Sequence, residues 1–402
     1  MNILTLNSGS SSIKFKLIQV ESHEVLAKGV SERIGLSKGQ FSYEIKGGPS
    51  NKELSYLPDH NAAVQLIFDL LFKQDAPYQI DGFAHRVVMG GYYFNDAVII
   101  DYHTIDKIRE LAPLAPLHNY PAASVIEACM SHYPSLSNVA IFDTAFHTTI
   151  PDKSSDYALP RDIIEKFKIK RYGAHGISHR FVSMRVKEYF DNADELKILS
   201  AHIGNGASLC AIKHGDSVNT TMGFTPLEGL VMGTRCGSID PAIVTYILEN
   251  SSLSASELNE IMNQKSGLLG LSGLSSDLRD IAEEAHKGNA QCQHAIEAYS
   301  DSVKCNMGSM VFSMGGCDVL AFTAGVGENS AIVRTLACSG LEELGFIIDE
   351  EKNQNAAIGN GEISVISAPE SQVQILVIPT NEELMMAMDA KRLLYGYQSL
   401  EF

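Results

Sequence analysis

Two arginines are the first candidates for chemistry, because their neighbours are apolar residues or glycines. Arg86 lies in FAHRVVMGG, a strand-like run in which Val88 points to the same face. Arg235 lies in MGTRCGSIDP, between Gly233 and Gly237. A buried guanidinium needs an anionic partner, and its planar fork fits a carboxylate or a phosphate. That partner is either a bound substrate or an internal carboxylate, and the sequence is compatible with both.

A histidine and two acidic residues occupy positions typical of active-site groups. Asp143 follows an apolar strand at 139–142, where α/β enzymes usually keep functional carboxylates, although a turn residue fits equally well. His175 lies between glycines in RYGAHGISH, which suits an exposed side chain over a ligand or a hydrogen-bonded turn. Glu382 in PTNEEL either holds a metal or complements a helix dipole. His175 and His179 have no neighbouring cluster of metal ligands, so zinc is not indicated.

Three stretches of small residues have the composition of phosphate-binding turns. They are NSGSSS at 7–12, HIGNGAS at 202–208 and TAGVGENS at 323–330. Backbone N–H groups and serine hydroxyls bind phosphate oxygens, and glycine lets the backbone approach closely. None matches the Walker or dinucleotide glycine patterns. In the third stretch we expect small residues at 324–327 before a helix that opens at Glu328, which would suit an adenosine and its α-phosphate.

The first two turns are framed by strand-like runs. Residues 13–18 alternate apolar residues with lysines at period two, which predicts a half-buried strand that forms a hairpin with residues 3–6. The second stretch repeats the plan, because apolar runs at 198–199 and 209–212 flank its turn. Since the two segments lie about half a chain apart, we expect two halves built on one plan.

Helical patterns fill much of the remaining sequence, and their alternation with strands predicts α/β layering. Asp277 is expected to cap a helix that runs to about residue 287, and Asn381 or Thr380 a last helix to about 394. The polar, irregular stretch 147–176 is the expected domain boundary. Further helices are expected at 60–73, 119–132, 178–190, 239–250 and 289–314.

Composition excludes several classes of partner. The chain has 402 residues and a net charge of −17, from 31 basic and 48 acidic residues. Such a surface repels nucleic acid and anionic membranes. No apolar run reaches the length of a membrane helix, and the N-terminus lacks the basic region of a signal peptide. The seven cysteines never have CxxC spacing, which indicates reduced thiols and a cytoplasmic protein.

Taken in order, the motifs resemble the acetate kinase family, within the superfamily of actin, sugar kinases and heat-shock ATPases. The resemblance runs nearly end to end, through NSGSSSIKF, HRVVMGG, APLHNYPA, FDTAFH, RYGAHGISHR, HIGNGAS, TPLEGLVMGTRCGSIDP, SGLSSDLRD, FTAGVGENS and PTNEE. It implies two similar ribonuclease-H-like (actin-like ATPase) domains with a duplicated βββαβαβα core, a cleft between them and a homodimer. We expect an acid-binding domain of residues 1–147 and 383–402, and a nucleotide-binding domain of residues 148–382.

The resemblance also implies the reaction, which is reversible phosphoryl transfer from ATP to acetate, giving acetyl phosphate and ADP. On this basis Arg86 binds the carboxylate of the acid, and Asp143 is the active-site carboxylate. His175 and Arg235 stabilise the transition state. Because acetate is already ionised at pH 7, its attack on the γ-phosphorus needs no general base. Asp143 therefore orients Arg86 or the waters of the metal, or moves a proton, and the sequence leaves these roles open.

Cofactor positions follow from the same resemblance. Asn7 and Glu382 match magnesium-binding positions, with Mn2+ as the other candidate metal. Lys14 matches an ATP-binding position. The other expected ATP contacts are His202, Ile203, Gly204, Asn205, Gly206, Asp277, Leu278, Arg279, Gly325, Val326, Gly327, Glu328 and Asn329.

Three positions depart from the family pattern. Ala174 replaces a phenylalanine that lines the pocket for the methyl group of the acid, beside positions that match Val88, Leu117 and Pro226. Losing that ring should enlarge the pocket unless a neighbour fills it, so we expect propionate to be used unusually well. Val88 still limits the pocket, so acetate remains the leading expected substrate. Met89 replaces a histidine, and Ser238 an acidic or amide residue whose loss could weaken the orientation of Arg235.

Two rival functions remain open from the sequence. A propionate or butyrate kinase would share every catalytic residue and differ only in the pocket lining. A nucleotide-binding switch or structural ATPase is the more distant alternative. A plain ATPase needs no carboxylate clamp, so Arg86, Arg235 and His175 argue against it, and the dependence of ATP turnover on added acid would decide.

Overall fold

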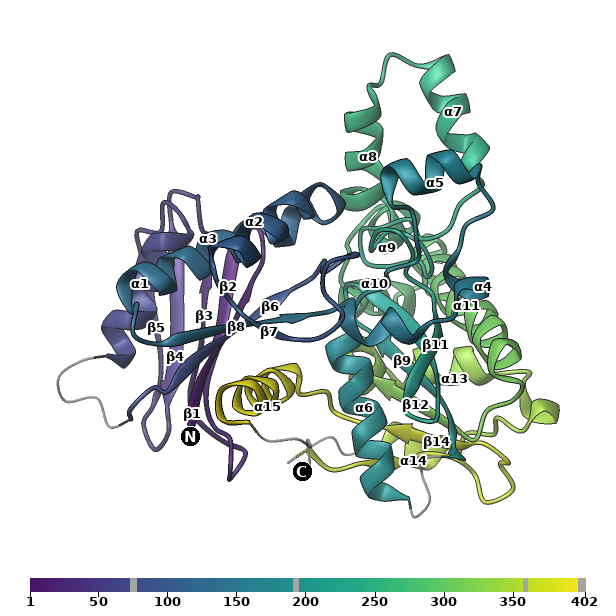
Figure 1. Ribbon diagram of the computed structural model, residues 1–402. Coiled ribbons are helices and arrows are strands. Elements are labelled where there is room, and N and C mark those ends of the chain that lie inside the picture. Colours follow the sequence, from purple (N-terminus) through teal and green to yellow (C-terminus); the bar gives the residue numbers. More distant parts are fainter. Residues whose placement is uncertain (73–77, 191–194, 357–360, 397–402) are drawn as a thin grey trace. The chain divides into compact units, whose positions relative to one another are not determined.

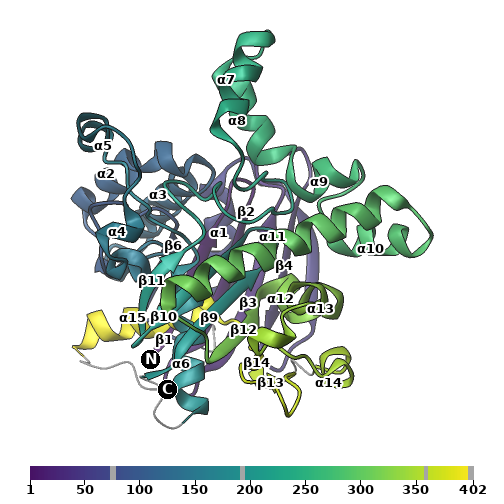
Figure 2. The ribbon, with the colours of Figure 1, turned by 90° about the vertical axis from the view of Figure 1, so that its right-hand side faces the viewer.

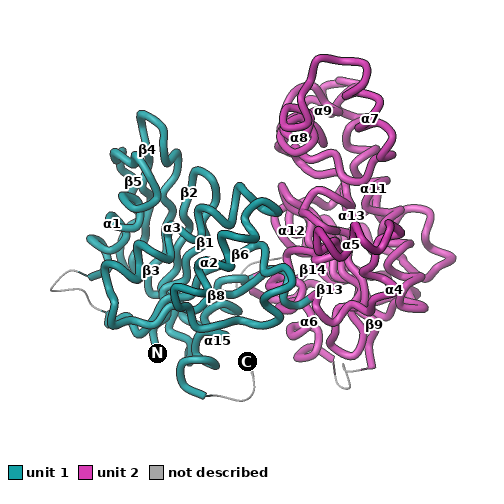
Figure 3. Tube along the Cα trace, turned by 45° about the horizontal axis from the view of Figure 1, so that its top comes forward, with its two compact units in different colours: residues 1–146, 381–402 teal, residues 147–380 magenta. Residues whose placement is uncertain are grey.

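The computed structural model describes residues 1–72, 78–190, 195–356 and 361–396. The chain divides into two compact units (Figure 3), unit 1 with residues 1–146 and 381–402, and unit 2 with residues 147–380. Each unit is built on one β-sheet, as Figure 1 shows.

Unit 1 contains an eight-stranded sheet in the order β5-β4-β3-β2-β1-β6-β8-β7. Strands β1 to β5 pair antiparallel, β1, β6 and β8 pair parallel, and β7 is an antiparallel edge. The strands are β1 (Asn2–Ser8), β2 (Ser12–Gln19), β3 (Glu24–Glu32), β4 (Gly39–Ile45), β5 (Ser50–Ser55), β6 (Gly82–Val87), β7 (Val98–Ile99) and β8 (Ser137–Phe142).

Four α-helices accompany this sheet in the described part of unit 1. Helices α1 (His60–Leu71) and α3 (Pro116–His132) contribute to an apolar core that also includes Leu4, Phe15 and Phe83. Helix α2 (Tyr102–Glu110) packs against α3, and α15 (Glu382–Tyr395) packs against β1, β6 and β8. The chain therefore returns from unit 2 to close the sheet of unit 1.

Unit 2 contains a six-stranded sheet in the order β11-β10-β9-β12-β14-β13. Its long helix α11 packs against β9, β10 and β11 (Figure 2), and α7 and α8 extend from this unit as a helical pair. The strands are β9 (Lys197–Ile203), β10 (Ala207–Lys213), β11 (Asp216–Thr220), β12 (Val319–Thr323), β13 (Ser364–Val365) and β14 (Gln374–Val377). The helices are α4 (Asp152–Ser155), α5 (Arg161–Phe167), α6 (Gly176–Tyr189), α7 (Pro241–Asn250), α8 (Ala255–Gln264), α9 (Gly267–Ser272), α10 (Leu278–His286), α11 (Ala290–Met314), α12 (Ala324–Asn329), α13 (Ala331–Cys338) and α14 (Glu350–Gln354).

The two sheets share one plan, as the sequence predicts. In each, a three-stranded antiparallel meander is followed by two parallel strands on its first-strand side: β3-β2-β1-β6-β8 in unit 1 and β11-β10-β9-β12-β14 in unit 2. The β1–β2 and β9–β10 hairpins are the equivalent first turns. Both expected hairpins are confirmed, and their equivalence explains why two similar small-residue turns occur half a chain apart.

Two expectations about local structure are wrong. The stretch 323–330 is not a loop before a helix at Glu328, because α12 already begins at Ala324. The carboxylate of Glu328 instead accepts the Ala324 backbone N–H at 2.8 Å, inside that helix. The stretch 147–176 is not wholly irregular, since it contains α4 and α5.

The described residues include no helix that is both long enough and apolar enough to cross a lipid bilayer. All seven cysteines are free thiols, and Cys129, Cys210, Cys292 and Cys338 are buried.

Candidate active site

One face of the unit 1 sheet gathers the candidate residues of that unit. Asn7 in β1 lies directly opposite Lys14 in β2, so the two side chains share a face. Leu6 pairs with His85 in the parallel ladder, which puts the next residues, Asn7 and Arg86, together on the other face. The alternation along the strands thus brings together residues that are far apart in the sequence.

Arg86 is held by two carboxylates. Its Nε and Nη2 atoms donate to the two carboxylate oxygens of Asp143 at 3.0 and 2.7 Å, a bidentate pair. Its Nη1 atom lies 3.6 Å from Glu382 Oε2. Burial acts to lower the pKa of Arg86, but the charges of Asp143 and Glu382 raise it overall. The internal carboxylate expected as one alternative for Arg86 is therefore Asp143.

Glu382 stands at the first position of α15, after the N-cap Asn381. Its Oε1 atom is buried and has no hydrogen-bond partner within the described part of the chain. Burial raises the pKa of Glu382, and Arg86 opposes that shift. The next residue, Glu383, pairs with Lys16 at 3.0 Å. A buried carboxylate oxygen without a partner is costly, so this atom has capacity to bind a further cation.

The apolar positions Val88 and Leu117 differ in exposure. Val88 is 7% exposed, whereas Leu117, near the start of α3, is 43% exposed.

Asn119 fixes the turn after β6, because its side-chain oxygen accepts the Met89 N–H at 3.0 Å and its amide donates to the Met89 carbonyl at 2.9 Å. Met89 is fully buried.

In unit 2 the second hairpin has an exposed tip and a buried base. Gly204 N–H donates to the Gly206 carbonyl at 3.1 Å, and Asn205 between them is exposed. Among the described residues, no hydrogen bond involves the backbone N–H groups of Asn205 and Gly206. These groups are available to an anion, as a phosphate-binding turn requires.

His175 precedes α6 in a left-handed conformation, with φ 57°. Such a conformation is uncommon outside glycine and marks a position held by its surroundings. The Nδ1 atom of His175 lies 2.9 Å from Ser208 Oγ, and its ring stacks on His202 at 4.1 Å. Ser208 Oγ lies 2.9 Å from Nε2 of His179, which is fully buried. Burial holds the pKa of His179 well below its ordinary value.

Arg235 has a different environment from Arg86. Its Nη1 atom donates to the Pro226 carbonyl at 2.9 Å, and within the described chain no carboxylate lies within ion-pair distance. Burial lowers its pKa. A Cβ atom built on Gly206 would lie 3.5 Å from His175 Nε2 and 3.7 Å from Arg235 Nη1. The histidine and the arginine therefore converge on the second hairpin.

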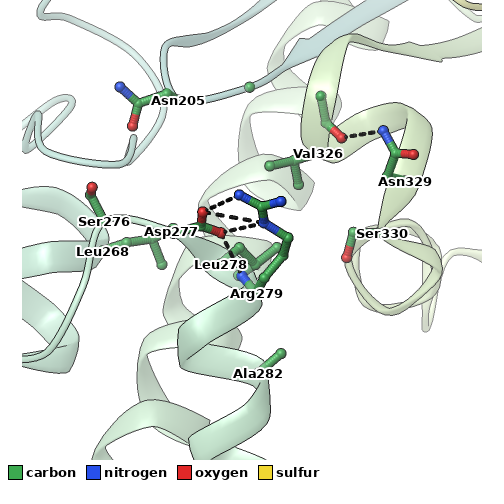
Figure 4. A pocket seen from close by; sticks show the side chains of 12 residues that line it. Asn205, Leu268, Ser276, Asp277, Leu278, Arg279, Ala282, Val326, Asn329 and Ser330 are labelled. Atoms are coloured by element: carbon green, nitrogen blue, oxygen red, sulfur yellow. Dashed lines mark hydrogen bonds and ion pairs between the residues drawn. The ribbon is translucent and has the colours of Figure 1, made fainter. Parts of the chain in front are cut away.

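A pocket of about 720 Å3 opens beside this hairpin (Figure 4). In Figure 4, Arg279 turns back onto Asp277, with Nη2 to Oδ2 at 2.5 Å, and this contact lowers the pKa of Asp277 to about 2. The expected ATP contacts that line the pocket are Gly204, Asn205, Asp277, Leu278, Arg279, Gly325, Val326 and Asn329. Four further lining residues, Leu268, Ser276, Ala282 and Ser330, were not among the expected ATP contacts.

The remaining expected ATP contacts do not line this pocket. Ile203 and Gly327 are buried, and a Cβ atom built on Gly327 would lie 3.6 Å from Ile203 Cβ. Glu328 Oε1 also accepts the backbone N–H of Thr380 at 3.0 Å. His202 donates or accepts at Ser178 Oγ through Nδ1, at 2.8 Å. Gly206 faces His175 and Arg235, as described above, and Lys14 belongs to unit 1.

Ala174 and Pro226, the other expected acid-pocket residues, belong to unit 2. Ala174 is 1% exposed and belongs to its apolar core. Its carbonyl lies 2.9 Å from Nε2 of His147. The carbonyl of Pro226 holds Arg235, and no such bond joins Arg235 to Ser238, whose Oγ accepts the Gly229 N–H. The Pro226 carbonyl therefore orients Arg235, and Ser238, which departs from the family pattern, does not.

Two positioning residues escaped notice in the sequence. Ser208 lies inside the quoted HIGNGAS motif, but its contact with both His175 and His179 depends on α6 packing against β9. Asn119 lies in the quoted motif APLHNYPA, but its hydrogen-bond partner Met89 is 30 residues away in the sequence. No periodicity in the sequence signals either contact.

Known proteins agree closely with this chain. A model of the acetokinase family matches residues 2–388. Over 400 residues, the acetate kinase of Caldicellulosiruptor bescii is 46% identical, covering 98% of this chain and 100% of that protein. The acetate kinase of Thermotoga maritima is 47% identical over 400 residues, with 98% of each covered.

Solved structures agree as well. The acetate kinase of Porphyromonas gingivalis has a TM-score of 0.90 at 40% identity, covering 98% of this chain and 99% of that one. The propionate kinase of Francisella tularensis has a TM-score of 0.92 at 38% identity, with the same coverage. The two units with one strand order are the duplicated actin-like α/β units expected from the sequence. The chain belongs to the acetokinase family.

Proposed function

We propose that this protein is an acetate kinase, which transfers the γ-phosphoryl group of ATP to acetate and forms acetyl phosphate and ADP reversibly. The observation that carries the proposal is the convergence of His175 and Arg235 on Gly206 in the second hairpin. An arginine without a carboxylate partner, beside free backbone N–H groups, is suited to a transferring phosphoryl group. Family membership gives the acceptor its identity.

Acid binding is assigned to Arg86. Its Nε and Nη2 atoms are already engaged by Asp143, so Asp143 fixes the plane of the guanidinium and leaves Nη1 directed elsewhere. Since acetate is ionised at neutral pH, the reaction has no proton for Asp143 to remove. Asp143 is therefore assigned an orienting role. The lining of the acid pocket is assigned to Val88, Leu117, Ala174 and Pro226.

In the transfer step, a carboxylate oxygen of the acid attacks the γ-phosphorus. The bond from that phosphorus to the bridging oxygen breaks, and ADP leaves with the electron pair. Charge on the equatorial oxygens is neutralised by the guanidinium of Arg235 and a hydrogen bond from His175. Ser208 and His179 keep the ring of His175 in place.

Nucleotide binding is assigned to the pocket of unit 2. The hairpin at Gly204 and Asn205 supplies backbone N–H groups for phosphate, and the walls at 277–279 and 325–329 receive the nucleoside. Lys14 of unit 1 is assigned to the phosphates, as the family resemblance implies. Its side chain is exposed and shares a face with Asn7.

The residues present fit a magnesium ion. Asn7 and Glu382 offer oxygen ligands from the same unit, and the buried Oε1 of Glu382 lacks a partner among the described residues. The described residues contain no cluster of three or more histidine, cysteine or acidic residues. Magnesium is commonly held by one or two carboxylates together with substrate phosphates. When bound, Mg2+ would neutralise phosphate charge.

We also propose a cytoplasmic homodimer. The seven free thiols support a reducing compartment. Helix α7 supports self-association, because it is rich in apolar residues yet buries none of them, and Ile243 and Tyr246 are 44% and 68% exposed.

The test is acid-dependent turnover. ADP release from MgATP should rise at least about 100-fold above the acid-free rate on adding acetate, and hydroxylamine should trap the product as a hydroxamate. Folded protein whose ATP turnover ignores added acid would support the ATPase alternative instead. Omission of Mg2+ should abolish turnover, and Mn2+ should restore part of it.

A propionate kinase is the second candidate, favoured by Ala174. One methylene in an apolar pocket is worth about 1–3 kcal/mol, or roughly 10–200-fold in kcat/KM. If Ala174 widens the pocket, propionate should approach or exceed acetate, and Ala174→Phe should restore the preference for acetate. Because Ala174 is in the core of unit 2, Tm must be measured for the variant, since overpacking alone costs about 1–3 kcal/mol.

A further inference from the structure

Residues 221–240, between β11 and α7, carry Arg235 without forming helix or strand. A long irregular segment holds one conformation only where its backbone is tied down. Its second half is tied to itself, because Met232 N–H donates to the Arg235 carbonyl at 3.1 Å and Ser238 N–H donates to the Gly229 carbonyl at 2.9 Å. It is also fixed to the rest of unit 2, since Gly233 N–H donates to the Asn205 carbonyl at 2.9 Å and Cys236 N–H donates to the Met262 carbonyl at 3.0 Å.

The first half is tied by three side chains, Tyr157, Arg171 and Glu228, which we call the Arg171 cluster. Nη2 of Arg171 donates to Glu228 Oε1 at 2.7 Å. The hydroxyl of Tyr157 donates to Glu228 Oε2 and accepts the backbone N–H of Phe224, the latter at 2.9 Å. Nη1 of Arg171 donates to three successive carbonyls at 3.1–3.2 Å, those of Thr220, Thr221 and Met222.

The Arg171 cluster connects both catalytic candidates of unit 2. On one side, the backbone N–H groups of Tyr172 and Gly173 both donate to the Gly223 carbonyl at 3.1 Å, just before His175. On the other side, Pro226 lies between Glu228, a member of the cluster, and Phe224, whose backbone N–H the cluster binds. The Pro226 carbonyl accepts from Nη1 of Arg235. The same three side chains therefore contribute to the positions of both catalytic side chains.

The cluster is tightly packed, so small displacements are resisted. A Cβ atom on Gly223 would lie 1.7 Å from Glu228 Oε2 and 2.1 Å from the hydroxyl of Tyr157. The side chains of Arg171 and Glu228 are 17% and 34% exposed. Burial, with the hydrogen bond to Glu228, raises the pKa of Tyr157, so its hydroxyl stays a donor at neutral pH.

We propose that Tyr157, Arg171 and Glu228 are positioning residues for phosphoryl transfer. They hold both His175 and Arg235 in place beside Gly206 of the second hairpin. The inference rests on the proposed kinase function. None of the three lines the nucleotide pocket, so their loss should lower kcat and spare nucleotide affinity. Misplacement of a reacting group by about 1 Å costs on the order of 100-fold in rate.

The first experiment compares Tyr157→Phe with a matched control, Tyr172→Phe. Both substitutions remove one hydroxyl from a mostly enclosed tyrosine, but the Tyr172 hydroxyl donates only to the Lys168 carbonyl, at 2.5 Å. We expect Tyr157→Phe to lower kcat about 10-fold, with the Kd for ADP within about two-fold of wild type. Tyr172→Phe should leave kcat within about two-fold. ADP affinity is measured by calorimetry, and the folded fraction by thermal unfolding.

The second experiment uses Glu228→Gln and Glu228→Ala. Glutamine keeps an acceptor for Arg171 and a polar group beside Tyr157, so it should retain several-fold more kcat than alanine. The double variant Tyr157→Phe/Glu228→Gln should be about as slow as the slower single variant, because residues that act as a unit are not additive. These variants keep the inference testable if Tyr157→Phe does not fold.

Equal kcat values for Tyr157→Phe and Tyr172→Phe in an active protein would overturn the inference while leaving the proposed function intact. A parallel loss of ADP affinity and kcat would also overturn it, since that pattern indicates general damage to unit 2. A wild-type protein without acid-dependent turnover would remove the proposed function, and this inference with it.

Discussion

Arg86 and Arg235 are candidate catalytic arginines in the two halves of a duplicated fold, yet they differ in how their charge is balanced. Arg86 makes a bidentate pair with Asp143 and lies 3.6 Å from Glu382. Arg235 donates to the Pro226 carbonyl and to the sulfur of Met232, and no carboxylate of the described chain pairs with it. The pKa of Arg86 is raised, and that of Arg235 is lowered by burial.

The difference indicates two ways to prepare an arginine for an anion. A guanidinium with carboxylate partners is fixed in orientation, at the expense of part of its attraction for a further anion. A partly buried guanidinium without such a partner keeps its full attraction but destabilises the fold until an anion arrives. The first suits a substrate present throughout, such as a carboxylate, and the second suits charge that develops during phosphoryl transfer.

The largest effect should come from Arg235→Met. Loss of the donor that meets the transferring phosphoryl group should lower kcat about 1,000-fold. Because no carboxylate loses its partner, the free energy of unfolding should stay the same or rise slightly. Steady-state kinetics and urea unfolding check the two parts. A clear loss of stability would show that Arg235 has an internal counter-ion after all.

The same substitution at Arg86 should have the opposite effect on stability. Arg86→Met leaves Asp143, which is 1% exposed, without its partner, and should cost about 3–5 kcal/mol in the free energy of unfolding at pH 7. It should also raise KM for acetate. Urea unfolding beside Arg235→Met gives the matched comparison. Equal stability of the two variants would contradict the distinction between the arginines.

Ser208→Ala should have a smaller effect on unit 2. It removes the hydroxyl between His175 and His179 and leaves a buried ring nitrogen of His179 unsatisfied, which costs about 1–3 kcal/mol. We expect kcat to fall about 10-fold while KM for ATP changes little. Steady-state kinetics over a range of ATP concentrations decides this. An unchanged kcat would show that Ser208 does not position His175 for phosphoryl transfer.

Glu382→Gln should alter how stability depends on pH. Burial raises the pKa of Glu382 in the folded protein, so its contribution is fully present below about pH 4.5, its unperturbed value, and is lost as pH rises through the raised pKa. Each pKa unit corresponds to about 1.4 kcal/mol. Without metal, the wild type should lose stability relative to Glu382→Gln as the pH rises above 4.5. A constant difference would contradict this assignment.

Much of this arrangement follows from the sequence. The alternation at 13–18 predicts the first hairpin, and Arg86 lies in a strand as expected, although that strand ends at Val87, before Val88. Asp143 directly follows β8, as expected. The pair between Arg86 and Asp143 could not be derived, because it spans 57 residues and depends on β6 and β8 lying side by side.

Other features could be identified only from the folded structure. In TAGVGENS, Glu328 satisfies backbone N–H groups of its own helix and of Thr380, so α12 starts earlier than the small residues suggest. The Arg171 cluster joins three segments between 157 and 228, none with a motif of its own. Local patterns predict local elements, whereas side chains that bridge segments depend on tertiary packing.

Direct transfer to the acid is the central claim of this account, and isotope labelling tests it most directly. Acetate carrying 18O in both carboxylate oxygens is incubated with MgATP, and the product is followed by 31P NMR. Attack of the carboxylate on the γ-phosphorus predicts acetyl phosphate with one 18O bonded to phosphorus, formed only when acetate is present. ADP release without acetate at the same rate, or acetyl phosphate without 18O on phosphorus, would contradict it.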